Sequence, residues 1–301
     1  MKEKIIEKIF ELKEKHRAVI LAHNYQLPEV QDIADFVGDS LELSRKAAES
    51  NAEVIVFCGV HFMAETASIL SPRKKVILPD SSAGCPMADM IDAKGLEIMK
   101  NKYPQAKVVC YVNSTAEVKA MSDVCCTSAN AVKIVSEIDS EIIFVPDQYL
   151  GTFASSRTGK KIHLWPGYCP THIKITPSDI EEGRRKNPGC IVMVHPECRP
   201  EVTHLADEVL STGGMLRFAS ASDAKKFLVV TEIGILHRLK KENPDKEFIP
   251  ATESAICPNM KKITLEKILS SLENLAPQIL VLEPVRSMAY RALLPLLQKN
   301  K

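Results

Sequence analysis

Three cysteines are the residues in this sequence with the clearest capacity for chemistry. Each precedes a proline, and they recur 84 and 88 residues apart: Cys85-Pro86, Cys169-Pro170 and Cys257-Pro258. Thiolates at equivalent positions of a repeated fold can converge on one metal centre, and three of them leave a coordination position open to substrate. The chain has no Cys-x-x-Cys pair of the kind that zinc sites use. The long, even spacing therefore favours a [4Fe-4S] cluster with one free iron.

The alternative is that these three cysteines are small core residues that happen to precede proline. Their threefold recurrence argues against this alternative. The remaining six cysteines lie mostly in or beside apolar runs and do not recur at three equivalent positions. We therefore expect them to pack in the core: Cys58, Cys110, Cys125, Cys126, Cys190 and Cys198.

Polar side chains follow three buried apolar runs at equivalent places in the chain. The segments are His23-Asn24-Tyr25, Tyr111-Val112-Asn113-Ser114 and His195-Pro196-Glu197. Histidine and glutamate can transfer protons near neutral pH, tyrosine can donate to a developing oxyanion, and asparagine can orient a carboxylate. Any one segment alone is more typical of a loop cap or a satisfied core group. Three at equivalent strand ends indicate a site.

Hydroxyl residues stand at three expected helix starts, namely Ser40, Ser128 and the run Ser211-Thr212-Gly213-Gly214. A hydroxyl there can cap the helix. The exposed N–H groups and the helix dipole can also bind phosphate or carboxylate, and both functions are compatible. The glycine pair makes the third segment the best candidate for a phosphate.

These segments need a scaffold of three repeated units. Short β-branched runs, typical of buried parallel strands, recur in three sets. The first set is 18–22, 107–112 and 190–194, the second is 53–57, 141–145 and 226–230, and the third is 75–78, 161–164 and 247–249. Helical patterns alternate with them at 41–50, 129–138 and 233–241.

This alternation predicts an α/β fold of three βαβαβ-like units packed around a shared centre. The predicted units are residues 1–88, 89–172 and 173–260, followed by a C-terminal helical wrap over 261–301. Ligands of parallel sheets bind beyond the carboxyl ends of the strands. The three polar strand ends should therefore face one another at that centre.

Composition excludes several classes of protein. The 39 basic and 38 acidic residues give a net charge of +1, so bulk charge does not indicate a nucleic-acid binder. No apolar run reaches the roughly 18 to 20 residues that span a bilayer, and no export signal is evident, so we expect a cytoplasmic protein. The odd count of nine cysteines argues against a disulfide framework. Dinucleotide, nucleotide-triphosphate and metalloprotease motifs are absent from the sequence.

The sequence as a whole resembles the quinolinate synthase family. The resemblance rests on segments in the same order over nearly the whole chain: LAHNYQLPEVQDIADFVGDS, PDSSAGCPMAD, YVNSTAEVKAMSDVCCTSANA, VHPEC, STGGM, TEIGILHRLKK and ICPNMKK. It implies a pseudo-threefold trefoil of three homologous three-layer α/β domains around a central [4Fe-4S] cluster, held here by Cys85, Cys169 and Cys257. The implied reaction condenses iminoaspartate with dihydroxyacetone phosphate to quinolinate, the pyridine precursor of NAD.

The resemblance also implies the residues that bind the iminoaspartate moiety: His23, Ser40, Tyr111, Asn113, Ser128, His195, Glu197 and Thr212, with Tyr25 close to the reacting atoms. Ser211 joins them as a neighbouring candidate for the phosphate. We expect Glu197 to act as general acid or base, assisted by His195 and Tyr25, and the open iron to act as a Lewis acid. Some family members carry Cys-x-x-Cys at the last cluster motif, but Cys257 is followed here by Pro258-Asn259-Met260.

Two other classes fit the same residues. One is another three-cysteine trefoil iron-sulfur enzyme that uses its cluster to transfer electrons. The other is a non-enzymatic anion-binding protein with a structural metal. The expected partners are the two small-molecule substrates and, transiently, the enzyme that produces iminoaspartate, with neither nucleic acid nor membrane among them.

Overall fold

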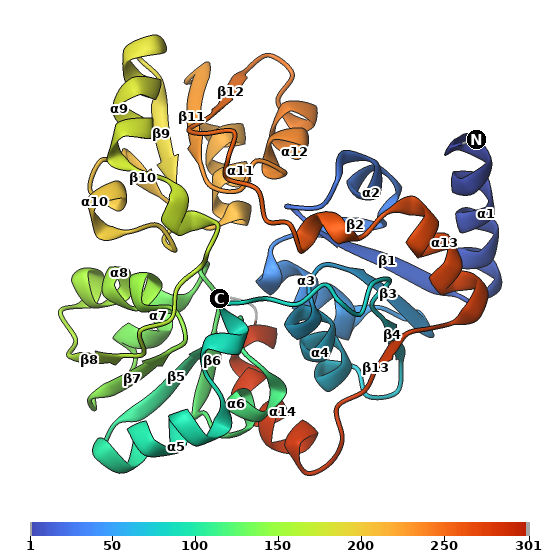
Figure 1. Cartoon of the computed structure of the whole chain (residues 1–301), viewed down its shortest axis with the longest axis horizontal. Helices are drawn as coiled ribbons and strands as arrows, with labels where there is room; N and C mark the ends of the chain where they lie inside the picture. The colour runs from blue at the N-terminus through green and yellow to red at the C-terminus, as the bar shows by residue number, and fades with distance from the viewer. Residues whose placement is uncertain (1, 299–301) are drawn as a thin grey trace.

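Three lobes meet at the centre of the molecule (Figure 1). The computed structural model describes residues 2–298, and their strands form three sheets. In each lobe the parallel strands have the same order, with the first strand between the second and the third: β2-β1-β3-β4, β6-β5-β7-β8 and β10-β9-β11-β12. The predicted α/β fold of three repeated units is therefore confirmed.

The first lobe contains α1 (Lys2–Lys15), β1 (Ala18–His23), α2 (Pro28–Ile33), β2 (Phe36–Gly38), α3 (Ser40–Glu49), β3 (Val54–Cys58), α4 (His61–Leu70) and β4 (Lys75–Ile77). The second contains α5 (Ala93–Lys102), β5 (Lys107–Tyr111), α6 (Ala116–Ala120), β6 (Val124–Cys126), α7 (Ala131–Ser136), β7 (Ile142–Val145), α8 (Gln148–Thr158) and β8 (Ile162–Leu164). The third contains α9 (Pro177–Lys186), β9 (Ile191–Val194), α10 (Pro200–Thr203), β10 (Glu208–Val209), α11 (Thr212–Ala221), β11 (Lys226–Val230), α12 (Ile235–Glu242) and β12 (Glu247–Pro250).

All nine predicted strands are present, and their ends differ from the prediction by at most one residue. The sequence reading missed the second strand of each lobe, β2, β6 and β10, because these strands are only two or three residues long. Central strands such as β3 and β7 are buried along their whole length. This burial explains why they read as continuous apolar runs rather than alternating ones.

An aspartate fixes the first strand of each lobe. In each lobe one carboxylate oxygen accepts a hydrogen bond of 2.7 to 2.8 Å from a backbone N–H of that strand; the aspartates are Asp35, Asp123 and Asp207, and the donors are Ile20, Val108 and Val192. The aspartate's own N–H donates back to the carbonyl of the same strand residue. The second carboxylate oxygen pairs with a cation, respectively Lys13, Lys107 and Arg184. The aspartate of the repeated motif therefore has a structural function.

The C-terminal segment returns to the first two lobes. Helix α13 (Leu265–Asn274) packs against α1, and β13 (Gln278–Ile279) pairs antiparallel with β4. Helix α14 (Val285–Leu297) packs against α6 and β6 of the second lobe and against α3 and α4 of the first. The sheet of the first lobe thus includes β13, which lies outside the predicted unit 1–88. The boundaries of the three units remain predictions. Among the helices of residues 2–298, none combines the length and apolar character needed to cross a bilayer.

We predict that Asp123→Ala lowers the free energy of unfolding by about 1 to 3 kcal/mol, because it leaves the N–H of buried Val108 without a partner. Asp123→Asn should cost less, since its amide oxygen can still accept that bond. Asp139→Ala is the matched control because the Asp139 side chain is fully exposed, and its effect should stay within about 0.5 kcal/mol. Urea unfolding followed by the fluorescence of Trp165, in the same lobe, measures all three; equal losses in the Asp123→Ala and Asp139→Ala variants would contradict the prediction.

Candidate active site

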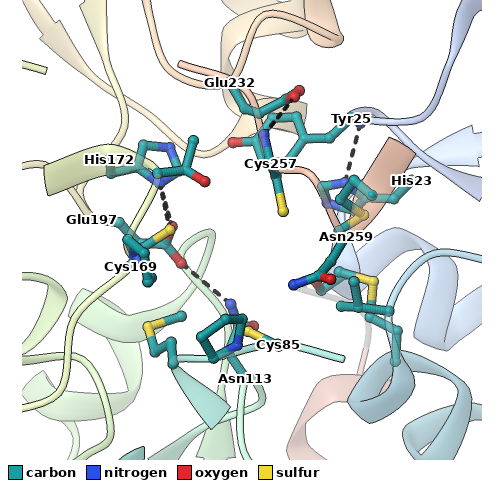
Figure 2. Close-up of a pocket in the computed structure, with 18 of the residues that line it drawn as sticks. His23, Tyr25, Cys85, Asn113, Cys169, His172, Glu197, Glu232, Cys257 and Asn259 are labelled. Atoms are coloured by element: carbon teal, nitrogen blue, oxygen red, sulfur yellow. Dashed lines mark hydrogen bonds and ion pairs between the residues drawn. The ribbon is translucent and has the colours of Figure 1, made fainter. Parts of the chain in front are cut away.

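The polar strand ends of all three lobes line one central cavity (Figure 2). Twelve of the thirteen predicted site residues line it: His23, Tyr25, Ser40, Cys85, Tyr111, Asn113, Ser128, Cys169, His195, Glu197, Thr212 and Cys257. The thirteenth, Ser211, does not line the cavity. Its hydroxyl accepts from the backbone N–H of Gly214 at 3.1 Å and so caps α11. Residues more than 200 positions apart are thus brought together.

The three candidate ligand cysteines occupy equivalent loops. Each stands three residues before the start of a short 3₁₀ helix: η1 (Ala88–Met90), η2 (His172–Lys174) and η3 (Met260–Lys262). All three cysteines are partly buried, whereas the other six described cysteines are buried, as expected of core residues. Burial raises the pKa of Cys85 to about 12 and also raises the pKa values of Cys169 and Cys257. These thiols therefore need a cation beside them to ionise near neutral pH.

The spacing of the three sulfurs bears on what they could hold. Two ligands of one ion at about 2.3 Å can be at most about 4.6 Å apart. Over residues 2–298, the one trio of ligand atoms that all lie within 4.8 Å of one another is that of Cys169, His172 and Glu197, so the three sulfurs do not meet this limit together. They surround a wider space, which suits a cluster of several metal ions better than a single ion.

Glu197 lies at the centre of the polar network. Its Oε1 accepts from the Tyr111 hydroxyl at 2.6 Å and from Asn113 Nδ2 at 3.3 Å, while its Oε2 lies 2.8 Å from His172 Nδ1. Burial alone would raise the pKa of Glu197. The charge and hydrogen bond of His172 and the hydrogen bond from Tyr111 instead lower it to about 2. Glu197 is therefore a carboxylate at neutral pH and can accept a proton.

His23 and His195 hold equivalent positions at the ends of β1 and β9. In each, ring Nδ1 accepts from the backbone N–H two residues further on, at 3.2 Å from Tyr25 and 3.4 Å from Glu197. Burial lowers the pKa of each imidazole to about 3, despite the negative charge of Glu197. Both rings are therefore neutral, and because Nδ1 accepts, the proton sits on Nε2 and can be donated to a ligand.

A chain of hydrogen bonds connects Tyr25 to Glu197. The Tyr25 hydroxyl lies 2.6 Å from Thr231 Oγ1, and that oxygen lies 2.8 Å from His172 Nε2. His172 Nδ1 then lies 2.8 Å from Glu197 Oε2. Burial raises the pKa of the Tyr25 phenol well above its ordinary value, so its proton stays on the oxygen. The chain gives a proton a continuous path between the two groups.

The hydroxyl residues behave differently from one another. The prediction of a helix cap is wrong for Ser40 and Ser128, because Asp39 caps α3 by accepting from the N–H groups of Leu41 and Glu42, and α7 begins only at Ala131. The hydroxyls of Ser40 and Ser128 are therefore not used by a helix start. Both residues line the cavity instead.

The cavity-lining Thr212 is held by residues from two lobes. Its Oγ1 accepts from Asn24 Nδ2 at 3.0 Å, and Asn24 Oδ1 accepts in turn from Arg238 Nη1 at 3.0 Å. The same guanidinium nitrogen donates to the Val37 carbonyl at 2.6 Å. These bonds connect β1 and β2 of the first lobe to α11 and α12 of the third, so the cavity wall depends on the docking of the two lobes.

The sequence reading missed three cavity residues with strong contacts or charge. His172 contacts both Cys169 Sγ, at 3.1 Å, and Glu197. Glu232 is fully buried, and its Oε1 accepts from the Cys257 N–H at 3.1 Å (Figure 2). The same oxygen pairs with Lys261 Nζ at 2.9 Å. Lys174 is the one lysine or arginine among the described residues that line the cavity.

The repeat contained a signal for two of them. The residues three positions after the three cysteines are Ala88, His172 and Met260, and of these only His172 has a titratable side chain. Glu232 stands two residues beyond β11, where the second lobe has Asp147 beyond β7. A comparison of the three units position by position would have found both.

Comparisons with known proteins agree with this site. The model of the family described as quinolinate synthetase A protein matches residues 7–298. The chain is 61% identical over 292 residues to the quinolinate synthase of Dehalococcoides mccartyi strain CBDB1, covering 97% of each chain. It is 55% identical over 294 residues to that of Thermodesulfovibrio yellowstonii, again covering 97% of each chain. It is 53% identical to quinolinate synthase 1 of Methanosarcina acetivorans, covering 96% of this chain and 95% of the relative. The three lobes meet in a cavity of thiols and imidazoles with Glu197 at its centre. Together with the similarity over nearly the full length, this site shows that the chain belongs to the quinolinate synthase family of NAD biosynthesis enzymes.

Proposed function

We propose that this chain condenses iminoaspartate with dihydroxyacetone phosphate to form quinolinate, with loss of one phosphate and two water molecules. The observation that carries the proposal is the convergence of three thiols and the Glu197 network in one cavity within a member of this family. The sum of the reaction is neutral in electrons, since the two substrates contain all the atoms of quinolinate, phosphate and water. It needs proton transfers and departing hydroxyl groups, and the cavity residues suit both.

We propose that Cys85, Cys169 and Cys257 hold a [4Fe-4S] cluster. The wide spacing of the sulfurs supports this, as does their need for a nearby cation to ionise. When bound, the cluster would supply an iron with an open coordination position, a Lewis acid for the loss of a hydroxyl group. The remaining steps would fall to side chains of the chain itself.

The neutral imidazoles suit the binding of the substrate carboxylates. His23 and His195 can each donate from Nε2 into the cavity, and Asn113 can donate from its amide. The hydroxyls of Ser40, Ser128 and Thr212 come from different lobes and would fix the remaining substrate oxygens. We place the phosphate near the start of α11, because the helix dipole favours an anion there and Thr212 faces the cavity.

Glu197 is our candidate for the group that takes the proton, because it is a carboxylate at neutral pH with both oxygens in the cavity network. A proton received at Oε2 can move through His172 and the Thr231 hydroxyl to Tyr25. Tyr25 would then donate to the hydroxyl group that leaves. Tyr111 keeps its proton, since burial and the charge of Glu197 raise its pKa, and it acts as a fixed donor to Glu197.

We predict that anaerobically purified protein forms quinolinate from iminoaspartate and dihydroxyacetone phosphate without any electron donor. Mass spectrometry of the product, with phosphate release measured in parallel, tests this. A strict need for an external reductant at each turnover would instead support the electron-transferring type of trefoil enzyme. Protein that lacks iron and sulfide should be inactive and colourless.

Cys85→Ser should lose both cluster and activity, because a serine hydroxyl is a poor ligand for iron in an iron-sulfur cluster. Cys190→Ser is the matched control, because this buried thiol packs in a separate core cluster away from the cavity. Iron and sulfide analysis with the visible absorption spectrum measures the outcome. Equal iron content in the two variants would remove Cys85 from the ligand set.

Glu197→Gln should keep the cluster but lower turnover by roughly 10² to 10⁴, the range that general acid and base groups supply. The amide keeps an oxygen that can accept from Tyr111 and Asn113, so the cavity should stay formed. Glu201→Gln is the control because that carboxylate is about half exposed and pairs with nearby Arg199 outside the cavity. Steady-state rates and iron content decide between three outcomes. Near-normal turnover would reduce Glu197 to a positioning residue, and loss of iron would make it a support of the cluster.

A further inference from the structure

Three side chains in the cavity have the arrangement of a single-ion site. Cys169 Sγ lies 3.1 Å from His172 Nδ1, which lies 2.8 Å from Glu197 Oε2, and all three atoms lie within 4.8 Å of one another. Ligands at about 2.0 to 2.3 Å around a tetrahedral zinc are about 3.3 to 3.6 Å apart. The two short distances would have to widen by about half an ångström, so modest side-chain movements would place these atoms around one ion.

The orientation of His172 favours coordination through Nδ1. It follows Cys169 by three residues on η2, so a rigid turn presents both side chains to the same side. Its Nε2 lies 2.8 Å from Thr231 Oγ1. Histidines that bind metals usually donate the other ring N–H to such a partner, which fixes the tautomer and the direction of the ring. Thr231 can take that function here.

The ligand set matches zinc better than other common ions. Zinc sites that keep a fourth position open to water have three protein ligands drawn from thiolate, imidazole and carboxylate groups. Here the thiolate and the carboxylate together balance the double positive charge of the ion. Zinc also binds such mixed sites more tightly than ferrous iron does. His172 and Glu197 are almost fully buried, so the ion would be shielded from water on that side.

We propose that the chain without its cluster binds one zinc ion through Cys169, His172 and Glu197. Cys85 and Cys257 take no part in this site. The zinc site and the cluster exclude each other because both need the Cys169 sulfur. This exclusion, unlike the zinc site itself, rests on the proposed function. A bound zinc ion also occupies the Glu197 oxygen that faces His172, so it blocks both cluster assembly and proton transfer.

The test uses the full-length chain, freed of iron by a chelator under anaerobic conditions and titrated with zinc chloride against a chromophoric chelator. Cobalt(II) in place of zinc gives an absorption spectrum that reports a sulfur ligand. We expect one equivalent to bind. Loss of a ligand in Cys169→Ala or His172→Ala should lower the zinc affinity by about 100-fold or more. Thr231→Val keeps every ligand and should lower the zinc affinity by about 10-fold.

Cys85→Ser and Cys257→Ser are the matched controls, and each should bind zinc as the unaltered chain does. Loss of zinc affinity in either variant would move the ion to the three cysteines and overturn the proposal. Unchanged affinity in His172→Ala, with the same circular dichroism as the unaltered chain, would also overturn it. Because Cys85→Ser cannot build the proposed cluster, its zinc binding tests this site independently of the proposed activity.

The exclusion is tested on the unaltered chain. One equivalent of zinc added before iron and sulfide should prevent most of the cluster absorption from developing, and a zinc chelator should restore it. Assembly at an equal rate with and without zinc would overturn the exclusion. The His172→Ala variant should assemble its cluster at the same rate in both conditions.

Discussion

The direction of the parallel strands is the constraint on which the rest of this structure depends. In a parallel sheet all carboxyl ends lie at one edge, and the loops that leave that edge carry the ligands. Each lobe directs this edge to the shared centre, where the residues after β1, β5 and β9 line one cavity with three cysteine loops. No lobe could build the site alone, because each supplies only one of the three cysteines.

A buried carboxylate is costly unless its surroundings compensate it. Glu197, which belongs to the third lobe, is compensated by three groups of the second lobe: Tyr111, Asn113 and His172. A second buried carboxylate, Glu232, is compensated by Lys261 and by two backbone N–H groups. Lys261 Nζ also donates to the Tyr25 carbonyl. The polar groups of the cavity are therefore held by the same contacts that hold the lobes together.

Much of the architecture could be predicted from the sequence, because a threefold repeat provides three independent readings of each strand. The short strands β2, β6 and β10 were missed since two or three residues carry too little hydrophobic pattern. The site was harder. Ser40 looked like a helix cap, but the neighbouring Asp39 takes that position with a stronger acceptor. His172 lies on the short 3₁₀ helix η2 and Glu232 lies in the loop after β11, and the function of both depends on which distant residue the fold brings near. Cys169 and Glu197 stand 28 residues apart in sequence, and no local pattern states that a histidine lies between them in space.

The return of the C-terminal segment to the first lobe has a consequence for how the protein is made. Strand β13 completes a sheet whose other strands lie within the first 77 residues, and α14 packs against both the first and the second lobes. Contacts between such distant parts of a chain form late, and they lower the rate of folding. During synthesis the first lobe must therefore wait, with an open edge beside β4, until almost the whole chain has left the ribosome. A truncated polypeptide that ends before residue 278 would leave the edge of β4 unpaired and prone to association with other chains.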